Sequence, residues 1–130
     1  MIGAMNTPLL TVYGIPNCDT VKKARSWLTE HGLAYQFHDY KKQGVPAGLV
    51  PDWIESPGWE MLLNRKGTTW RKLDEATRLA VVDAASATAL MLAQPSVIKR
   101  PVVVWPEQRI TVGFDTEKFA AHAAALALKA

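Results

Sequence analysis

Residues 9–31 read LLTVYGIPNCDTVKKARSWLTEH, and this stretch decides the fold. Its first seven residues, 9–15, are a short apolar and β-branched run that a proline ends, which is typical of a buried strand. Over residues 21–31 apolar side chains recur at helical spacing, and Gly32 is a typical residue just past a helix end. Residues 34–40 then alternate as in a second strand. Strand, helix and strand in this order predict a parallel βαβ unit.

The middle of the chain is expected to be mostly helical. Residues 47–54 predict a short helix interrupted by Pro51, and residues 64–72 predict a polar, basic loop. A helix capped by Asp74 follows, and a further helix runs to about residue 94. These segments form a helical insertion between the two strand-rich ends of the chain.

The end of the chain returns to strands. Residues 102–104 and 109–114 are β-branched runs on either side of a turn, so they predict a hairpin, and Asp115 is suited to cap a last Ala-rich helix. We therefore expect an α/β protein of thioredoxin-like type, with a small mixed four-stranded sheet flanked by helices. A single domain over residues 1–130 is expected, with residues 1–8 as a loose lead-in.

Composition excludes several classes of protein. The chain has 130 residues, of which 48% are hydrophobic and 21% charged, so it is an ordinary globular protein. With one cysteine and three histidines at no ligand-like spacing, neither a disulfide scaffold nor a metal site is expected. The net charge of +3 does not favour nucleic-acid binding, and five tryptophans suit a core and its rim. The apolar runs are too short to span a membrane, and no targeting signal is present, so we expect a cytoplasmic protein.

Cys18 lies between the first strand and the first helix. The N–H groups at a helix start favour negative charge, so this position stabilises a thiolate. The polar residues around it favour a reactive thiol over the small buried hydrophobe that a lone cysteine often is, and Asp19 or Thr20 is suited to cap the helix. Ile15 and Val21 stand where a second cysteine often lies in redox folds of this type, so an oxidised Cys18 needs an external thiol.

Three arginines could serve such a thiol. Arg65 lies in a loop, Arg100 precedes a proline, and Arg109 opens the last strand. Arginine suits the binding of oxyanions and carboxylates through forked hydrogen bonds. The loop before the predicted hairpin comes close to the helix start that carries Cys18, but spacing alone does not separate this role from that of solvated surface charges.

Four segments in the same order resemble the ArsC-type arsenate reductases, which are thioredoxin-like. They are residues 14–24 (GIPNCDTVKKA), 37–40 (FHDY), 62–73 (LLNRKGTTWRKL) and 98–104 (IKRPVVV). The likeness covers nearly the whole chain. It extends to the YffB-like subgroup, which is grouped with the Spx and MgsR regulators.

The resemblance implies roles for individual residues. Cys18 matches the catalytic cysteine, and three arginines match those that bind the oxyanion and stabilise the thiolate: Arg65, Arg100 and Arg109. Pro101 matches a proline that is cis in this fold. Asn17, directly before the cysteine, is expected among the substrate-binding residues. The approach to the cysteine differs from that of the arsenate reductases, which places arsenate itself in question.

Together these features predict a monothiol oxidoreductase, expected to be a glutathione-dependent thiol reductase. Its Cys18 thiolate would attack a small oxyanion or a glutathione mixed disulfide, and glutathione or glutaredoxin would resolve the adduct. Glutathione is expected as a co-substrate, with no bound cofactor. Two alternatives stay open: an Spx-like regulatory module that docks on RNA polymerase, and an arsenate reductase proper.

Overall fold

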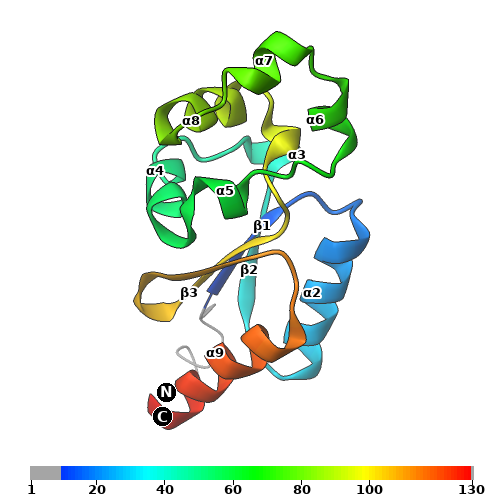
Figure 1. Ribbon diagram of the computed structural model, residues 1–130. Coiled ribbons are helices and arrows are strands. Elements are labelled where there is room, and N and C mark those ends of the chain that lie inside the picture. The colour runs from blue at the N-terminus through cyan, green and yellow to red at the C-terminus, as the bar shows by residue number, and fades with distance from the viewer. Residues whose placement is uncertain (1–9, 130) are drawn as a thin grey trace. The chain divides into compact units, whose positions relative to one another are not determined.

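The computed structural model describes residues 10–129, which form two compact units (Figure 1). The first unit combines the chain up to Gln43 with the chain from Arg100 onward, and the second is Gly44–Lys99. The helical insertion expected from the sequence is therefore a compact unit. The expectation that the whole chain behaves as a single domain stays a prediction.

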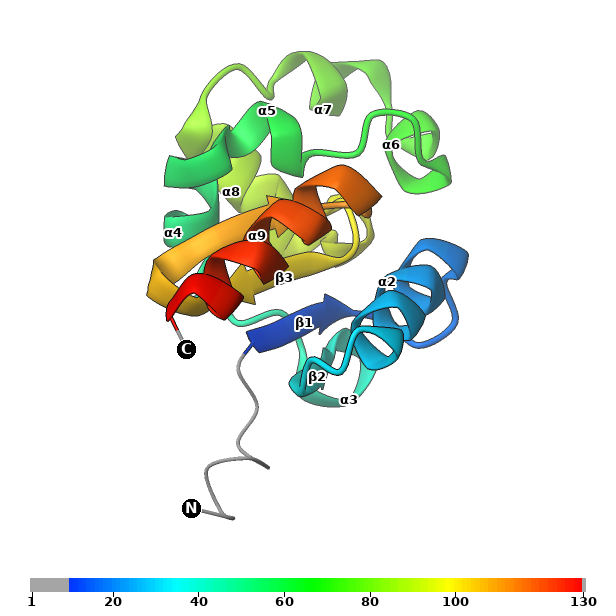
Figure 2. The same ribbon diagram turned by 90° about the horizontal axis from the view of Figure 1, so that it is seen from below.

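The first unit is built on a four-stranded mixed sheet. Its strands are β1 (Leu10–Gly14), β2 (Tyr35–Asp39), β3 (Val102–Trp105) and β4 (Arg109–Val112), in the spatial order β2-β1-β3-β4. β1 pairs with β2 in parallel, and the β1–β3 and β3–β4 pairs are antiparallel. Figure 2 shows β2, β1 and β3 side by side. The predicted fold class and the predicted βαβ unit and hairpin are confirmed.

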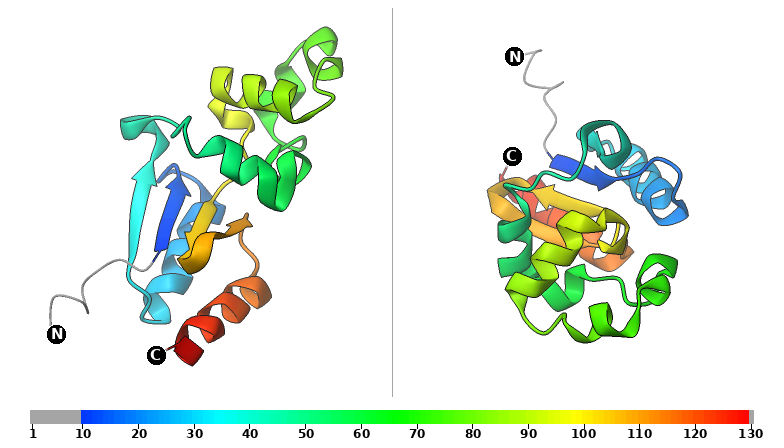
Figure 3. Two further views of the ribbon diagram at one scale, coloured as in Figure 1. Left: turned by 90° about the vertical axis from the view of Figure 1, so that its left-hand side faces the viewer. Right: turned by 90° about the horizontal axis from the view of Figure 1, so that it is seen from above.

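Two long helices, α2 (Asp19–Glu30) and α9 (Thr116–Lys129), cover one face of this sheet (Figure 3). Alternate residues of the strands face them, since side chains on a strand point to opposite faces in turn. The resulting core consists of Leu10, Val12, Ala24, Leu28, Val103, Trp105 and Phe119, all buried. As predicted, Gly32 follows α2 with a φ of +70°, and the Asp115 carboxylate accepts hydrogen bonds from two N–H groups at the start of α9.

One short helix of the first unit was not expected from the sequence. α3 (Tyr40–Gln43) follows β2 directly. The buried Tyr40 anchors it, and the Asp39 carboxylate accepts a hydrogen bond from the Lys41 N–H at 2.9 Å.

The second unit consists of short helical pieces. They are α4 (Val50–Trp53), a π-helical turn (Ile54–Gly58), α5 (Trp59–Leu62), α6 (Thr68–Lys72), α7 (Glu75–Leu79), α8 (Ala84–Ala93) and a 3₁₀ turn (Pro95–Val97). Asp74 caps α7 as predicted, and Asp83 caps α8. Two expectations are wrong. Pro51 stands in the first turn of α4, where its missing N–H costs nothing, and residues 68–72 are helical rather than a loop.

The second unit closes around its own apolar side chains. The buried residues are Val50, Trp53, Ile54, Leu62, Leu63, Ala87, Leu90, Met91, Val97 and Ile98. The Lys99 N–H donates to the Leu62 carbonyl and the Asn64 N–H to the Val97 carbonyl, both at 2.8 Å, so the end of the insertion is held to the segment that follows α5. Between residues 10 and 129, none of the helices is both long and apolar enough to cross a bilayer.

Candidate functional site

Cys18 is the N-cap residue of α2. Its backbone is extended, with φ −147° and ψ 123°, and its carbonyl accepts the first hydrogen bond of the helix from the Lys22 N–H at 2.9 Å. The side chain is half-buried and its thiol is free. The expectation that Asp19 or Thr20 caps α2 is wrong, because the cysteine occupies the cap position and no side chain caps the helix. The N–H groups of the first turn are therefore available to a negative charge at the sulfur.

A tight contact fixes this helix start against the sheet. A Cβ at Gly14 would lie 2.9 Å from Cγ2 of Val21, in the first turn of α2, and 3.9 Å from Cβ of Arg100. Only a residue without a side chain lets β1, α2 and the chain before β3 approach so closely. Gly14 thus gathers the loop that carries Cys18 and the start of β3 at one end of the sheet.

Arg100 and Pro101 lie at this same end. Tyr13 of β1 pairs with Val102 of β3, so the residues just before β3 stand beside the end of β1 that leads to Cys18. The Arg100–Pro101 peptide bond is cis, and the Pro101 carbonyl accepts a hydrogen bond from the Gly113 N–H at 2.8 Å. Arg100 is half-buried, and Asn17 is exposed directly before the cysteine.

The structure does not bring Arg109 to Cys18. Arg109 pairs with Trp105, the last residue of β3, which puts it at the opposite end of the sheet from Pro101. There it lines a small hollow with the ring of His122, which stacks on Trp105 with the ring centroids 5.0 Å apart. Arg109 was expected beside the thiol. The pairing of β3 with β4 instead places Arg109 at the turn end of the hairpin, a full strand length from Arg100.

Arg65 belongs to the second unit. It is exposed in the turn before α6, and its guanidinium carbon lies 5.6 Å from the ring centroid of Trp59 and 5.9 Å from that of Trp70. Both contacts are within cation–π range, so two indole rings hold the charge in place. Its approach to Cys18 stays a prediction.

A group of aromatic residues that the sequence did not single out lies on the face of the sheet opposite α2. Tyr13 and His38 are paired across β1 and β2 with ring centroids 4.9 Å apart, and Tyr40 follows at 6.1 Å from His38. The Tyr40 hydroxyl is buried without a hydrogen-bond partner. Burial raises the pKa of Tyr40, nearby Tyr13 raises it further, and the charge of Arg100 lowers it. Arg100 therefore lies within electrostatic reach of this hydroxyl.

Comparison with known proteins identifies the family of such a site. The model of the ArsC family matches residues 13–122 of the chain. A solved structure named YffB protein is 52% identical, with a TM-score of 0.80, over 87% of this chain and 97% of the other. The solution structure of an arsenate reductase (ArsC) related protein from Brucella melitensis is 54% identical, with a TM-score of 0.67, over 86% of this chain and 92% of the other.

The chain is also similar to a curated regulator. The global transcriptional regulator Spx of Listeria innocua is 22% identical over 112 residues, which are 85% of this chain and 83% of the regulator. Similarity thus extends to a protein named as related to arsenate reductase and to one named for transcriptional control.

Proposed function

The chain belongs to the ArsC family, and on that premise we propose that it is a monothiol reductase that takes glutathione mixed disulfides as substrates. The family and its arsenate-reductase-related neighbour support a thiol oxidoreductase. The observation that carries the finer proposal is the position of Cys18, the one cysteine of the sequence, as the uncapped start of α2. The N–H groups of a helix start favour negative charge at the sulfur, and no second thiol in the chain can displace Cys18 from a disulfide.

The reaction has two exchange steps. The Cys18 thiolate attacks the glutathionyl sulfur of a mixed disulfide; the old S–S bond breaks, a Cys18–glutathione disulfide forms, and the substrate leaves as a thiolate that takes a proton. A second glutathione thiolate then attacks the glutathionyl sulfur of this adduct. Oxidised glutathione leaves and Cys18 is restored, so in the net reaction the incoming glutathione sulfur is oxidised to the disulfide level, the substrate sulfur is reduced to a thiol, and the glutathione of the mixed disulfide ends in oxidised glutathione.

Arg100 is proposed to stabilise negative charge during these steps. Its backbone lies at the Cys18 end of the sheet, and in each exchange step one sulfur departs as an anion. A guanidinium offers donors in a fixed fork and stays charged at all working pH values. Asn17, exposed beside the thiol, and Arg65 of the second unit are the further proposed contacts to the substrate.

The first experiment follows reduction of a small glutathione mixed disulfide by glutathione, coupled to glutathione reductase. We expect turnover by the unmodified protein, none by Cys18→Ser, and a single glutathionyl adduct on the unmodified protein by mass spectrometry. Glutathione-dependent turnover that Cys18→Ser leaves unchanged would show that the mechanism is wrong.

Two arginines form a matched pair for the second experiment. Arg100→Gln should lower kcat/KM about tenfold or more, the value of a lost charge-assisted hydrogen bond. Arg109→Gln removes the same charge at the far end of the sheet and should leave the rate unchanged. Equal losses in the two variants would mean that net charge, rather than the position of Arg100, governs the reaction.

The similarity to Spx supports a second candidate, a regulatory module that docks on RNA polymerase. A pull-down of RNA polymerase that survives Cys18→Ser, together with no turnover in the reductase assay, would favour it. Arsenate reduction is a third candidate, which the same coupled assay tests with arsenate as substrate. Arsenate turnover faster than mixed-disulfide turnover would favour that activity over the thiol reductase.

A further inference from the structure

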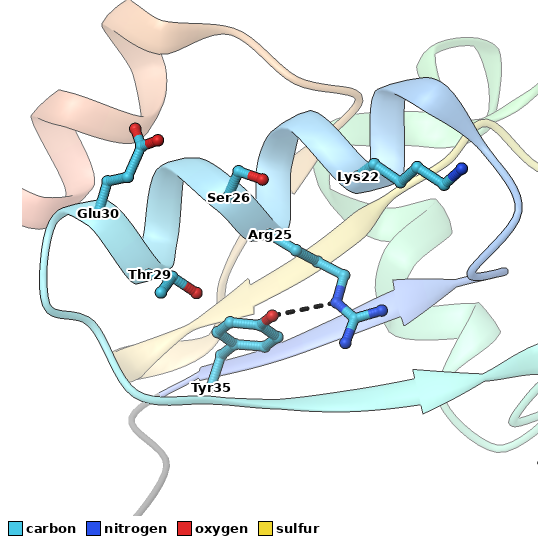
Figure 4. A pocket seen from close by; sticks show the side chains of 6 residues that line it. All are labelled: Lys22, Arg25, Ser26, Thr29, Glu30 and Tyr35. Carbon is cyan, nitrogen blue, oxygen red and sulfur yellow. Dashed lines mark hydrogen bonds between the residues drawn. The ribbon is translucent and has the colours of Figure 1, made fainter.

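An open groove runs along the outer side of α2, between this helix and the edge strand β2 (Figure 4). It is lined by Lys22, Arg25, Ser26, Thr29, Glu30 and Tyr35. Its volume is about 530 Å³, within the range of roughly 300–1,000 Å³ that ligand sites occupy. Two cations of the lining, Lys22 and Arg25, lie nearer the Cys18 end of the helix, and the one anion of the lining, Glu30, lies at the other end.

Arg25 is held in a fixed position in this groove. Its Nε donates to the Tyr35 hydroxyl at 3.0 Å (Figure 4). Its guanidinium carbon also lies 4.1 Å from the ring centroid of Phe37. The side chain is half-buried, yet among residues 10–129 no carboxylate pairs with it. A charge that is partly withdrawn from water needs compensating groups around it, and here one hydroxyl and two aromatic rings supply them. The guanidinium is thus ordered in advance for an anion from outside the chain.

The lining of the groove starts at Lys22, about one helical turn from the proposed reaction centre at Cys18. Cys18, Lys22, Arg25 and Thr29 are spaced by four, three and four residues, so they follow one face of α2. At about 1.5 Å of rise per residue, Arg25 lies about 10 Å along the helix from Cys18. An extended peptide covers about 3.3–3.6 Å per residue, so this distance corresponds to about three residues of a bound chain.

We propose that this groove binds an acidic segment of the protein substrate, with a carboxylate about three residues from the cysteine that Cys18 frees of glutathione. The proposal rests on the proposed function, since it names the substrate class of the same thiol. Arg25 holds the carboxylate, Lys22 adds a second positive charge nearer the sulfur, and the hydroxyls of Ser26 and Thr29 are further donors. Glu30 repels acidic residues farther along, which sets the end of the preferred segment.

A protein segment fits the groove better than glutathione does. The lining extends past Arg25 to Thr29 and Glu30, about 16–18 Å along the helix axis from Cys18. A tripeptide fully extended spans only about 10–11 Å from end to end, and the sulfur of glutathione is on its middle residue. Glutathione joined to Cys18 would therefore leave the distal half of the groove empty, whereas a peptide of five or six residues would fill it.

The test uses three peptides, each with one glutathionylated cysteine. One carries Glu three positions before the cysteine, one carries Glu three positions after it, and the third carries Gln at both positions. We expect the full-length protein to reduce one of the Glu peptides with a kcat/KM about fivefold above the Gln peptide, the effect of a partly exposed ion pair. Equal values for all three peptides would overturn the proposal.

Three variants test whether the preference for a Glu peptide arises from the groove. Arg25→Gln should bring the ratio of Glu to Gln peptide close to one, and Tyr35→Phe, which keeps the charge but frees the arginine, should reduce the ratio by a smaller amount. Lys23→Gln is the matched control, because this exposed residue of α2 is outside the groove lining and should leave the ratio unchanged. Circular dichroism checks that each variant is folded. A ratio that Arg25→Gln preserves would refute the proposed contact.

A small glutathione mixed disulfide that carries no peptide tests whether the groove binds the peptide or glutathione itself. Arg25→Gln should leave its reduction unchanged, and an equal loss there would assign the groove to glutathione and overturn the proposal. If the unmodified protein reduces none of these disulfides, the proposed function fails, and the groove is tested by NMR with cysteine-free Glu and Gln peptides. Shifts of the Arg25 Nε–H signal with the Glu peptide alone would then support an acidic ligand, and no shift would refute it.

Discussion

Gly14→Ala tests whether the end of the sheet that leads to Cys18 is as closely packed as the structure indicates. The new methyl would lie 2.9 Å from Cγ2 of Val21, about 0.6 Å inside the shortest favourable carbon–carbon separation of about 3.5 Å. Val21 is completely buried, and a β-branched residue in a helix has essentially one side-chain rotamer, so it cannot turn away. The helix start must therefore move away from the strand.

The expected cost follows from two opposing effects. Overpacking of a closed site costs about 1–3 kcal/mol. Replacing glycine by alanine where φ is not positive returns about 0.4–1 kcal/mol, because the unfolded chain loses freedom. We expect Gly14→Ala to lower the free energy of unfolding by about 1–2 kcal/mol, measured by urea denaturation and by hydrogen exchange of the α2 amides. Gly48→Ala is the matched control: no atom lies within 4 Å of its new methyl, so it should be neutral or slightly stabilising.

A double variant makes the reasoning refutable. Val21→Ala alone should cost about 2 kcal/mol, for two buried methyl groups and the space they leave. In Gly14→Ala/Val21→Ala the new methyl occupies part of that space, so the double variant should be about 1–2 kcal/mol more stable than the sum of the single effects predicts. Additivity within about 0.5 kcal/mol would refute the contact.

Three further changes test the rest of the first unit. Tyr40→Phe removes a buried hydroxyl without a partner, so the free energy of unfolding should rise by about 1 kcal/mol in urea denaturation. Burial raises the pKa of Tyr40, so its hydroxyl loses the proton at a lower pH in the unfolded chain than in the folded one. The free energy of unfolding should therefore fall as the pH rises past about 10, and it should fall less in Tyr40→Phe. Burial and then the charge of Arg109 lower the pKa of His122, so Arg109→Gln should raise it in an NMR titration, and an unchanged value would contradict the contact. Gln108 has a φ of +61°, so Gln108→Gly should raise the free energy of unfolding by up to about 1 kcal/mol in thermal denaturation.

The first half of the fold could be predicted because its signals are local. Alternation in residues 34–40 and helical spacing after Cys18 both reflect which side chains face the core, and Gly32 has the positive φ that favours glycine. Helix α6 lacked such signals. Its N-cap is Gly67, no side chain caps it, and none of its five residues is buried, so nothing in residues 68–72 marks a helix.

The candidate site could be predicted in part for a related reason. Cys18 was found because it stands at the start of a predicted helix, and Pro101 because the family resemblance assigned it, whereas the placement of Arg109 depends on strand register. The predicted hairpin already contained the necessary information. Arg100 precedes its first strand and Arg109 follows its turn, and positions before a strand and after the turn lie at opposite ends of a hairpin. The acidic-segment groove depends on side-chain contacts between α2 and β2, which spacing alone does not give.

The position of the arginines bears on which substrate suits the thiol. A tetrahedral oxyanion such as phosphate carries about 1.5–2 negative charges near pH 7, and arsenate is its close analogue. Binding it beside a thiolate calls for several cations at once. The first unit brings Arg100 to the Cys18 end of the sheet and holds Arg109 at the other end. In thiol–disulfide exchange the attacked sulfur is uncharged, and a single negative charge moves to the departing sulfur. Of Arg100 and Arg109, Arg100 alone stands at the Cys18 end and matches that single charge, which supports the proposal of a mixed disulfide over arsenate; Arg65 of the second unit stays the proposed contact to the rest of the substrate.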